Sequence, residues 1–482
     1  MATISSPGLG SGLDVNGIVS KLVALERRPI ELLQSQASKL QTQLSSFGLL
    51  QSYLSNLQSA AARLAQPSFW KESSASSSDA ASVSASASSG AAAGSYAIQV
   101  TQLAQAHSLA SKAYLDSTTS VGTGTLRIEL GGWNADRTVF TPKSGSTPVD
   151  VTIGPGEDSL ESIRAKINAA NAGVTATIVK DASGARLVVR SNLTGEQSSV
   201  RLTVTDDDGN SADANGLSAL AYDPAAATGQ MTQTLAGRDA IAIVNGLQVQ
   251  SSSNVLDGVV EGLKLTLSKT TASTVEVKVA PDTEAQKKAI DSFVSAYNDI
   301  AKYLAEQTKY DASTKKAGAL QGDRSAVMLQ NQLRSLLREA SGASATYPRL
   351  SNLGLEVQSD GTLKVNSTKL DAALADPSEV AKAFSAVDEA NPSNEGFAVK
   401  FRKFTALATG SEGVVTTRTQ GLRDAIKRNN DQQERYEDRV ALIEKRLLRQ
   451  YTALDSSVGQ LNGLASYVQQ QMAALAKASG SK

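Results

Sequence analysis

Cysteine is absent from this chain of 482 residues, and histidine occurs only once, as His107. The sequence therefore offers no thiolate nucleophile, disulfide or thiolate metal site. A single histidine also makes neither a multi-histidine metal centre nor a histidine-based catalytic relay. We expect His107 to be a surface or core residue with satisfied hydrogen bonds, not a ligand. No enzymatic activity, cofactor or metal is expected.

Aromatic residues and net charge are also scarce. Aromatic residues make up 4% of the chain, and 47 basic residues balance 47 acidic ones. A net charge of zero gives no reason to expect nucleic acid or an anionic membrane as a partner. A chain of 482 residues is too long for one core and should divide into about three or four domains. Because alanine, serine and threonine fill long tracts, we expect thin, extended packing.

Signals for membrane insertion and secretion are missing as well. No run of about 18 uncharged apolar residues is present to span a bilayer, so membrane insertion is not expected. The first basic residue is Lys21, and glycines interrupt the chain before it, so no cleaved secretory signal is predicted. Taken alone, these features predict a cytoplasmic protein.

The sequence does contain a seven-residue apolar repeat near each end. The first repeat consists of Leu33, Leu40, Phe47, Leu54 and Ala61, joined by Leu50, Leu57 and Leu64. The second consists of Val440, Leu447, Leu454, Leu461, Val468 and Leu475. This interval predicts coiled-coil helices. Because each buried leucine is worth roughly 1.5–3 kcal/mol, the two stripes should pack on each other or on another copy.

A shorter helix is predicted ahead of the first repeat. Asp14 or Asn16 can cap it. Its apolar residues share one face: Ile18, Leu22 and Leu25. Pro29 is expected to end or kink this helix before the heptad helix runs to about residue 64. Residues 1–12, which contain several glycines, are expected to be flexible.

The start of the chain carries a resemblance. Residues 8–22 read Gly-Leu-Gly-Ser-Gly-Leu-Asp-Val-Asn-Gly-Ile-Val-Ser-Lys-Leu. This segment resembles the start of the bacterial flagellar filament-capping proteins, also called the hook-associated protein 2 family. The likeness extends over roughly residues 1–110 and from Leu235 to the end of the chain, and it includes the segment 352–384.

The resemblance implies a structural cap at the distal tip of the flagellar filament, where exported flagellin folds and is incorporated. The partners it implies are further copies of the chain, flagellin, the filament tip or hook–filament junction proteins, and a flagellar export chaperone. It also implies an extracellular protein that leaves the cell through the flagellar channel without a cleaved signal peptide. The expected filament-docking and oligomer contacts are Leu13, Ile18, Leu22, Leu25, Leu33, Leu40, Phe47, Leu54, Val440, Leu447, Leu454, Leu461, Val468 and Leu475.

The expected fold class is α+β multidomain, with a terminal coiled-coil leg, a helical and β body, and inserted β-rich head domains. The leg is predicted from an N-terminal segment over 1–70 and a C-terminal coiled-coil helix over 411–482 that pairs with it. A Ser/Ala-rich linker over 71–94 follows the N-terminal leg, and the body domain is expected from 95–110 and 281–410. The outer head domain is predicted over 111–234, and the inner head domain over 235–280, completed by strands near 95–130. Because the terminal stripes lack a core of their own, deleting residues 1–64 should leave a folded body.

Local patterns in the head segments predict further detail. A short helix is expected from Asp158 or Ser159 to about residue 167. Asn245-Gly246 between two apolar runs predicts a β-hairpin. The acidic loop 206–210 contains a glycine, as calcium loops do, but lacks an acid at the first ligand position and a glutamate at the last. We expect a solvated hairpin loop there.

Two alternative functions stay open. One is another flagellar axial or junction protein, which the motif at residues 11–26 disfavours. The other is a surface adhesin on a coiled-coil stalk, alone or as a second role of the cap. Addition of the purified protein to cap-deficient cells separates these functions, because only a cap restores filament growth.

Overall fold

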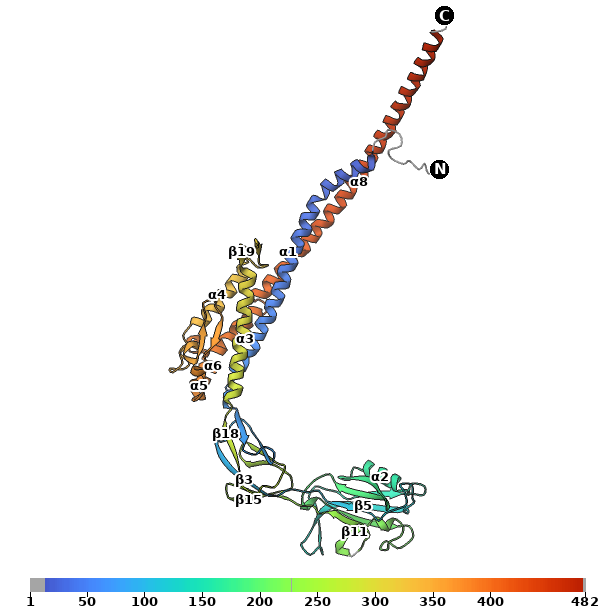
Figure 1. Cartoon of the computed structure of the whole chain (residues 1–482), viewed down its shortest axis with the longest axis vertical. Coiled ribbons are helices and arrows are strands. Elements are labelled where there is room, and N and C mark those ends of the chain that lie inside the picture. Colours follow the sequence, from blue (N-terminus) through green and yellow to red (C-terminus); the bar gives the residue numbers. More distant parts are fainter. Residues whose placement is uncertain (1–13, 227, 480–482) are drawn as a thin grey trace. The chain divides into compact units, whose positions relative to one another are not determined.

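The computed structural model describes residues 14–226 and 228–479. The chain divides into two compact units, one formed by residues 1–67 with 283–482 and the other by residues 68–282. The first unit is mainly helical and the second mainly β, as Figure 1 shows. The predicted α+β multidomain class is therefore confirmed.

The first helix, α1 (Val15–Leu64), is a single helix of 50 residues. The Asp14 carboxylate caps it by accepting a hydrogen bond from the Gly17 amide at 2.8 Å. Pro29 lies inside this helix and does not end it, contrary to one outcome expected from the sequence. The lost amide hydrogen bond and the ring clash cost about 3 kcal/mol. Burial of apolar side chains on both sides of Pro29 offsets that loss, because tertiary packing provides most helical stability.

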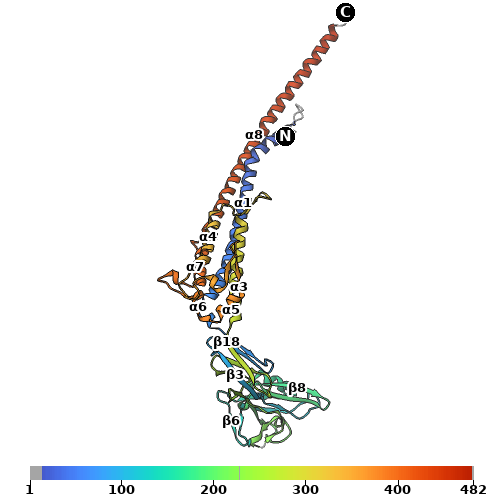
Figure 2. The same cartoon turned by 60° about the vertical axis from the view of Figure 1, so that its left-hand side comes forward.

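The other helices of the first unit surround or extend along α1. Their bounds are α3 (Thr283–Thr308), α4 (Arg324–Arg338), α5 (Ser367–Leu374), α6 (Pro377–Ser385), α7 (Phe397–Thr409) and α8 (Val414–Ser479). Both α3 and α8 lie beside α1 in the two views of Figures 1 and 2. Two hairpins complete this unit: β19 (Tyr310–Asp311) with β20 (Lys316–Ala317), and β21 (Leu355–Val357) with β22 (Leu363–Val365). Across residues 14–226 and 228–479, no helix has the length and apolarity needed to cross a bilayer.

The second half of α1 belongs to the core of the helical unit. Phe47, Leu50, Leu54 and Leu57 are completely buried. The Tyr303 hydroxyl of α3 donates a hydrogen bond to the Ser46 carbonyl of α1 at 2.9 Å. Deleting residues 1–64 would thus remove part of this core, so the structure does not favour a folded helical body after that deletion.

The inner head domain consists of two antiparallel sheets around one apolar core. The larger sheet has the order β1 (Ser73–Ser77), β18 (Val275–Pro281), β3 (Gly94–Gln102), β14 (Ala240–Val244) and β15 (Leu247–Ser251). The smaller has the order β16 (Val255–Val260), β17 (Leu263–Leu267) and β2 (Val83–Ala87). Asn245 and Gly246 have φ of 49° and 86°, as the left-handed turn between β14 and β15 requires. The predicted hairpin is confirmed.

Two predicted segments are corrected by this sheet order. The segment 71–94 is not a linker, because it contributes β1 and β2. Its serines and alanines have low strand propensity, and pairing with β18 and β17 overrides that preference. Residues 94–102 form the middle strand of the larger sheet and do not join the helical body. An isolated stretch of sequence does not reveal such long-range pairing.

The outer head domain has a second apolar core, between two sheets and one helix. One sheet has the order β12 (Thr228–Gly229), β11 (Tyr222–Asp223), β10 (Ser199–Asp206), β5 (Gly124–Trp133) and β6 (Phe140–Pro142), and β7 (Val149–Ile153) also pairs with β5. The other has the order β13 (Thr232–Leu235), β4 (Ser108–Ala110), β9 (Gly184–Ser191) and β8 (Val174–Asp181). The helix α2 (Leu160–Ala169) is capped by Ser159, as predicted. Since β5 lies in this domain, only β3 among the strands near 95–130 completes the inner head.

The acidic loop after β10 is organised by hydrogen bonds to the protein. The buried Asp206 carboxylate accepts bonds from the Ser218 amide and hydroxyl, each at 2.7 Å. Asp206 therefore points inward and does not belong to an open, solvated loop as expected. Within the described parts of the chain, no group of three or more potential metal ligands gathers in one place.

His107 is a core residue of the outer head domain, in line with the expectation for it. Its Nδ1 atom accepts a hydrogen bond from the Val200 amide at 3.1 Å. Its ring lies 5.9 Å from the Trp133 ring and 5.6 Å from the Tyr222 ring. Burial, with a smaller contribution from the positive charge of Arg137, lowers the pKa of His107 to about 4. The imidazole is neutral in the folded protein at neutral pH.

The outer head should lose stability in mild acid because of His107. Its pKa is lower in the folded state than in the unfolded chain, so unfolded protein binds the proton more readily between pH 6.5 and 4. The contribution of His107 is complete above pH 6.5, and about 2–3 kcal/mol of it is lost at pH 4.5. Urea unfolding followed by Trp133 fluorescence in a Trp70→Phe background measures this change. His107→Asn keeps a hydrogen-bond acceptor and should flatten the pH dependence; an equally steep dependence would contradict the assignment.

Candidate functional site

The two ends of the chain meet in an apolar seam between α1 and α8. Val15, Val19, Val23 and Ile30 of α1 form a buried cluster with Val440 of α8. Leu447, Leu448 and Tyr451 of α8 pack against this cluster and are half-buried. Residues 15–30 at the start of α1 meet residues 440–451 in the middle of α8. Since α1 continues from there past α7, which precedes α8 in the chain, α1 and α8 run antiparallel. The predicted pairing of the terminal helices is confirmed.

The seam uses a different face of α1 from the one the sequence indicated. Ile18 and Leu22 are half-buried, and the exposed fraction of Leu25 is 55%. The first part of α1 has two adjacent apolar stripes, and the three valines of the other stripe face α8. The stripe of Ile18, Leu22 and Leu25 continues to Leu32, whose exposed fraction is 72%. Among the described residues, this second stripe is half-buried at its start and exposed from Leu25 to Leu32.

Several of the predicted docking residues are inside the monomer. Phe47, Leu54 and Val440 are buried at 2% exposure or less, so they cannot contact another molecule in this fold. They are buried because other helices of the same chain already cover them. Leu33, Leu40 and Leu447 are half-buried on α1 and α8. Leu13 lies outside the described residues.

We call α1 together with α8 the rod. The last part of α8 carries the most exposed apolar surface of this rod. Leu454, Leu461, Val468 and Leu475 have exposed fractions between 47% and 64%. Three other large residues of this segment are also exposed: Leu464, Tyr467 and Met472. Sequence reasoning missed Leu464 and Tyr467 as site residues because they fall outside the seven-residue repeat. The sequence feature that could have indicated them is their large apolar side chains within an otherwise polar, alanine-rich helix.

Before the buried cluster around Val440, α8 has a polar segment that includes Asn429 and Gln433. Asn429 of α8 is buried on the side that faces α1, and within the described chain its Nδ2 atom has no hydrogen-bond partner. Its Oδ1 atom accepts a bond from Gln433 at 2.6 Å. A single buried asparagine in a helix seam fixes register at some loss of stability. Its bond to Gln433 joins neighbouring turns of α8, so Asn429 makes this part of the rod polar inside.

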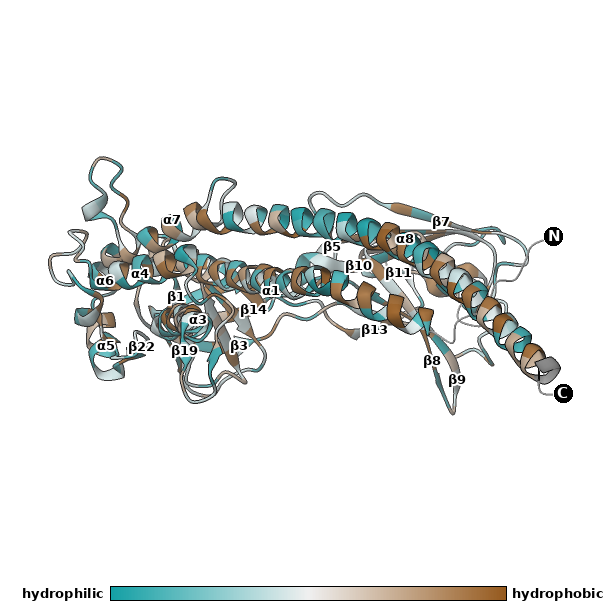
Figure 3. Cartoon of the chain, turned by 90° about the horizontal axis from the view of Figure 1, so that it is seen from above, coloured by the Kyte–Doolittle hydropathy of each residue, from teal (hydrophilic) through white to brown (hydrophobic). Residues whose placement is uncertain are grey.

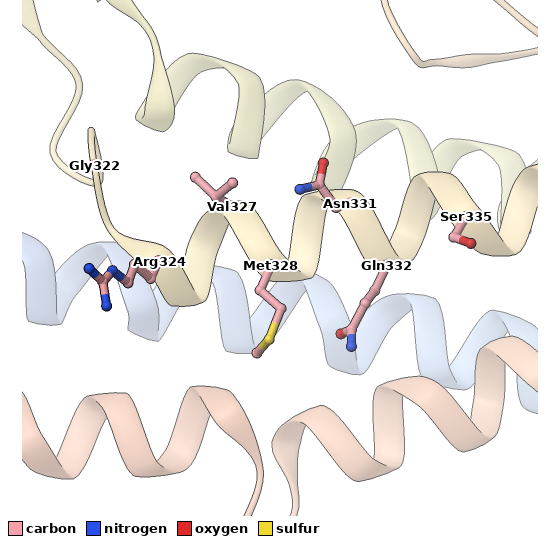
Figure 4. Close-up of a pocket in the computed structure, with 7 residues that line it drawn as sticks. All are labelled: Gly322, Arg324, Val327, Met328, Asn331, Gln332 and Ser335. Carbon is pink, nitrogen blue, oxygen red and sulfur yellow. The ribbon is translucent and has the colours of Figure 1, made fainter.

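A shallow hollow of about 580 Å³ lies along α4, and Figure 4 shows the residues around it. They are Gly322, Arg324, Val327, Met328, Asn331, Gln332 and Ser335. Val327 and Asn331 point to one side of α4, and Met328 and Gln332 to the other. The residues that line this hollow include no carboxylate or histidine that could act as a base for Ser335.

The architecture is of the class in which two terminal helices form a rod and β domains are inserted between them. Family models described as the N-terminus and the C-terminus of flagellar hook-associated protein 2 match residues 11–107 and 237–463. A model described as the flagellin hook IN motif matches residues 139–193.

Known proteins are similar over nearly the whole chain. The flagellar hook-associated protein 2 of Escherichia coli (strain K12) is 30% identical, with 98% of each chain covered. The A-type flagellar hook-associated protein 2 of Pseudomonas aeruginosa is 30% identical, with 97% of each covered. The crystal structure of the flagellar cap protein FliD D1-D2-D3 domains from Escherichia coli has a TM-score of 0.62 at 29% identity and covers 78% of this chain and 99% of that one. This chain belongs to the flagellar hook-associated protein 2 family.

Burial in the seam makes a matched pair of substitutions informative. Val440 is 2% exposed and Leu442, two residues later on the same helix, is 68% exposed. Val440→Ala should destabilise the rod by about 1–3 kcal/mol, through lost burial and a cavity. Leu442→Ala should change stability by less than about 0.5 kcal/mol in the monomer. Thermal unfolding followed by circular dichroism, at concentrations where the chain sediments as a monomer, compares the two. Equal effects would contradict the described seam.

Proposed function

We propose that this chain caps the distal tip of a bacterial flagellar filament and promotes the folding and incorporation of exported flagellin there. Membership of the hook-associated protein 2 family supports this function, and so does the similarity to a solved flagellar cap protein. The structural observation that carries the proposal is the uncovered apolar surface of the rod: the second stripe of α1 and the last part of α8.

The exposed stripes fit attachment to other helices. Each leucine moved from water into a helix interface stabilises the complex by roughly 1.5–3 kcal/mol. Side chains spaced by three, four and seven residues are those that an amphipathic helix inserts into a neighbouring groove. In Figure 1 the last turns of α8 extend beyond the start of α1, and the large apolar side chains there are exposed. This end of α8 is the part of the rod that most needs a partner.

The proposed partners follow from this surface and from the family. Further copies of the chain would form a homo-oligomeric cap, and flagellin and the filament tip or hook–filament junction would bind the terminal helices. We also propose export through the flagellar channel without a cleaved signal peptide, assisted by a flagellar export chaperone, and an extracellular location. In this function the chain acts as a structural protein and not as an enzyme.

Charged substitutions on the last part of α8 test the proposal. Leu461→Asp with Val468→Asp places two charges on the exposed apolar stripe, where burial against a partner would desolvate them. Ser466→Asp with Gln470→Asp is the matched control, because these residues lie on the other side of the same exposed helix segment. Purified proteins are added to cap-deficient cells, and filament length is measured by electron microscopy.

We expect the unchanged protein and the control variant to restore filament growth, and the Leu461 and Val468 variant to leave filaments at the length seen without added protein. Circular dichroism should give all three proteins the same unfolding temperature within about 2 °C, because the substituted residues are exposed. Failure of the unchanged protein to restore growth would contradict the capping function. Full activity of the Leu461 and Val468 variant would show that this stripe is not the attachment surface.

A further inference from the structure

We infer that a hollow in the outer head domain binds a small carboxylate that also carries a hydrogen-bond donor, either an amine or a hydroxyl group. The hollow has a volume of about 350 Å³, near the lower end of the usual range for small-molecule sites. We call it the head hollow, and the lining residues that carry the argument are His107, Trp133, Asn134, Arg137, Glu196 and Gln233. Trp133 ends β5, Glu196 precedes β10 and Gln233 lies in β13, three strands that Figure 3 labels. The capping function makes no use of this hollow.

Hydrogen-bond donors around the head hollow lack acceptors within the chain. The Nδ1 atom of His107 accepts the Val200 amide hydrogen, so Nε2 carries the proton of the neutral imidazole. Among the described residues, neither this Nε2–H nor the buried Nε1–H of Trp133 has a hydrogen-bond partner. Gln233 accepts a bond from the Tyr222 hydroxyl through Oε1, and its Nε2 atom likewise donates to no described residue. A ligand with acceptor atoms would satisfy the donors that face the hollow.

Two charges of opposite sign also border the head hollow. In the part of the chain that the structure describes, neither the Arg137 guanidinium nor the Glu196 carboxylate forms an ion pair or a side-chain hydrogen bond. Burial lowers the pKa of His107 and raises that of Tyr222, and the positive charge of Arg137 acts on both, so the guanidinium lies near these rings. Because the two charges do not pair with each other, each is available to a ligand.

The turn that carries Arg137 is held in one conformation by Asn134. The Asn134 Oδ1 atom accepts hydrogen bonds from the amides of Thr138 and Val139 at 2.8 and 3.0 Å, and its Nδ2 atom donates to the Thr138 hydroxyl at 2.9 Å. The Arg137 amide donates to the Asn134 carbonyl at 2.9 Å. Arg137 has a φ of 53°, which few residues other than glycine adopt. Its backbone is thus fixed beside the hollow, which reduces the ordering that ligand binding requires.

The charges of the head hollow favour a carboxylate over a phosphate. A guanidinium presents parallel N–H groups that match the two oxygens of a carboxylate, and it matches a phosphate equally well. A phosphate group carries a larger negative charge at neutral pH, however, and Glu196 lines the same hollow. A ligand with one carboxylate for Arg137 and one donor for Glu196 satisfies both residues. Amino acids, hydroxy acids and acidic sugars share this chemistry.

Titration of the full chain with defined compounds tests the inference. The chain has one histidine, so the imidazole resonances of histidine-labelled protein report on the head hollow alone. Glycine, glycolate and glucuronate each combine a carboxylate with a donor and represent the three sources. Glycinamide and glucose lack the carboxylate, and inorganic phosphate tests the other anion. Trp133 fluorescence in a Trp70→Phe background gives a second reading of each dissociation constant.

We expect at least one of glycine, glycolate and glucuronate to bind with a Kd below about 1 mM, and about tenfold more tightly than glycinamide, glucose and phosphate. The compound that binds identifies the source of the carboxylate. Its negative charge should also raise the pKa of His107 above about 4, since an anion near the imidazole favours the protonated form. A histidine titration by NMR, with and without the compound, measures this change.

Matched variants locate the binding site. Arg137→Gln should weaken binding about tenfold, because it removes the charged fork that holds the carboxylate. Lys180→Gln is the control, because Lys180 is an exposed cation at the other end of the β8–β9 hairpin from His107. Glu196→Gln should weaken binding of glycine about tenfold and leave glycolate or glucuronate within about threefold, since the amide oxygen still accepts a hydroxyl hydrogen.

Two results would overturn the inference. One is a Kd above about 1 mM for all three carboxylates. The other is equal binding by the Arg137→Gln variant and the unchanged protein, with circular dichroism showing that both are folded. Either result leaves the capping function standing, because restoration of filament growth in cap-deficient cells is measured separately.

Discussion

The antiparallel pairing of α1 with α8 is the interaction on which the rest of the molecule depends. It joins two segments that are separated by almost the entire chain, and it makes the β domains an insertion between two halves of one helical unit. The buried cluster of Val15, Val19, Val23 and Val440 connects the first turns of α1 to α8. Further along, Phe47 and Leu54 anchor α1 to the body. The described ends of the chain are therefore joined to one folded helical unit.

The pairing of α1 with α8 is apolar at some places and polar at others. Apolar residues fill the seam near Val440 and again around Phe47, whereas Asn429 and Gln433 occupy the segment between them. Outside the seam, the surface of the rod also changes along its length. Exposed charges of both signs cover α8 around Asp431, and exposed apolar residues follow from Leu454 onward.

The inserted β domains show how chain segments of little apolar content can still be ordered. β1 and β2 consist of serine, alanine and a single valine, yet each pairs along its full length with a strand from beyond residue 260. Backbone hydrogen bonds hold these strands, and the neighbouring strands provide most of the buried side chains. The core therefore stays thin, as the low aromatic content suggested.

Sequence alone determined the features that depend on neighbours along the chain. The two long terminal helices, the Asp14 and Ser159 caps and the Asn245-Gly246 hairpin each reflect local spacing or turn chemistry, and each appears in the structure. The tertiary structure decided which of two apolar stripes of α1 faces α8, that Phe47 and Leu54 are core residues and not docking residues, and that residues 73–87 form strands. These outcomes depend on surfaces contributed by segments far away in the chain. A local pattern shows that a stripe must be covered, but only the folded chain determines what covers it.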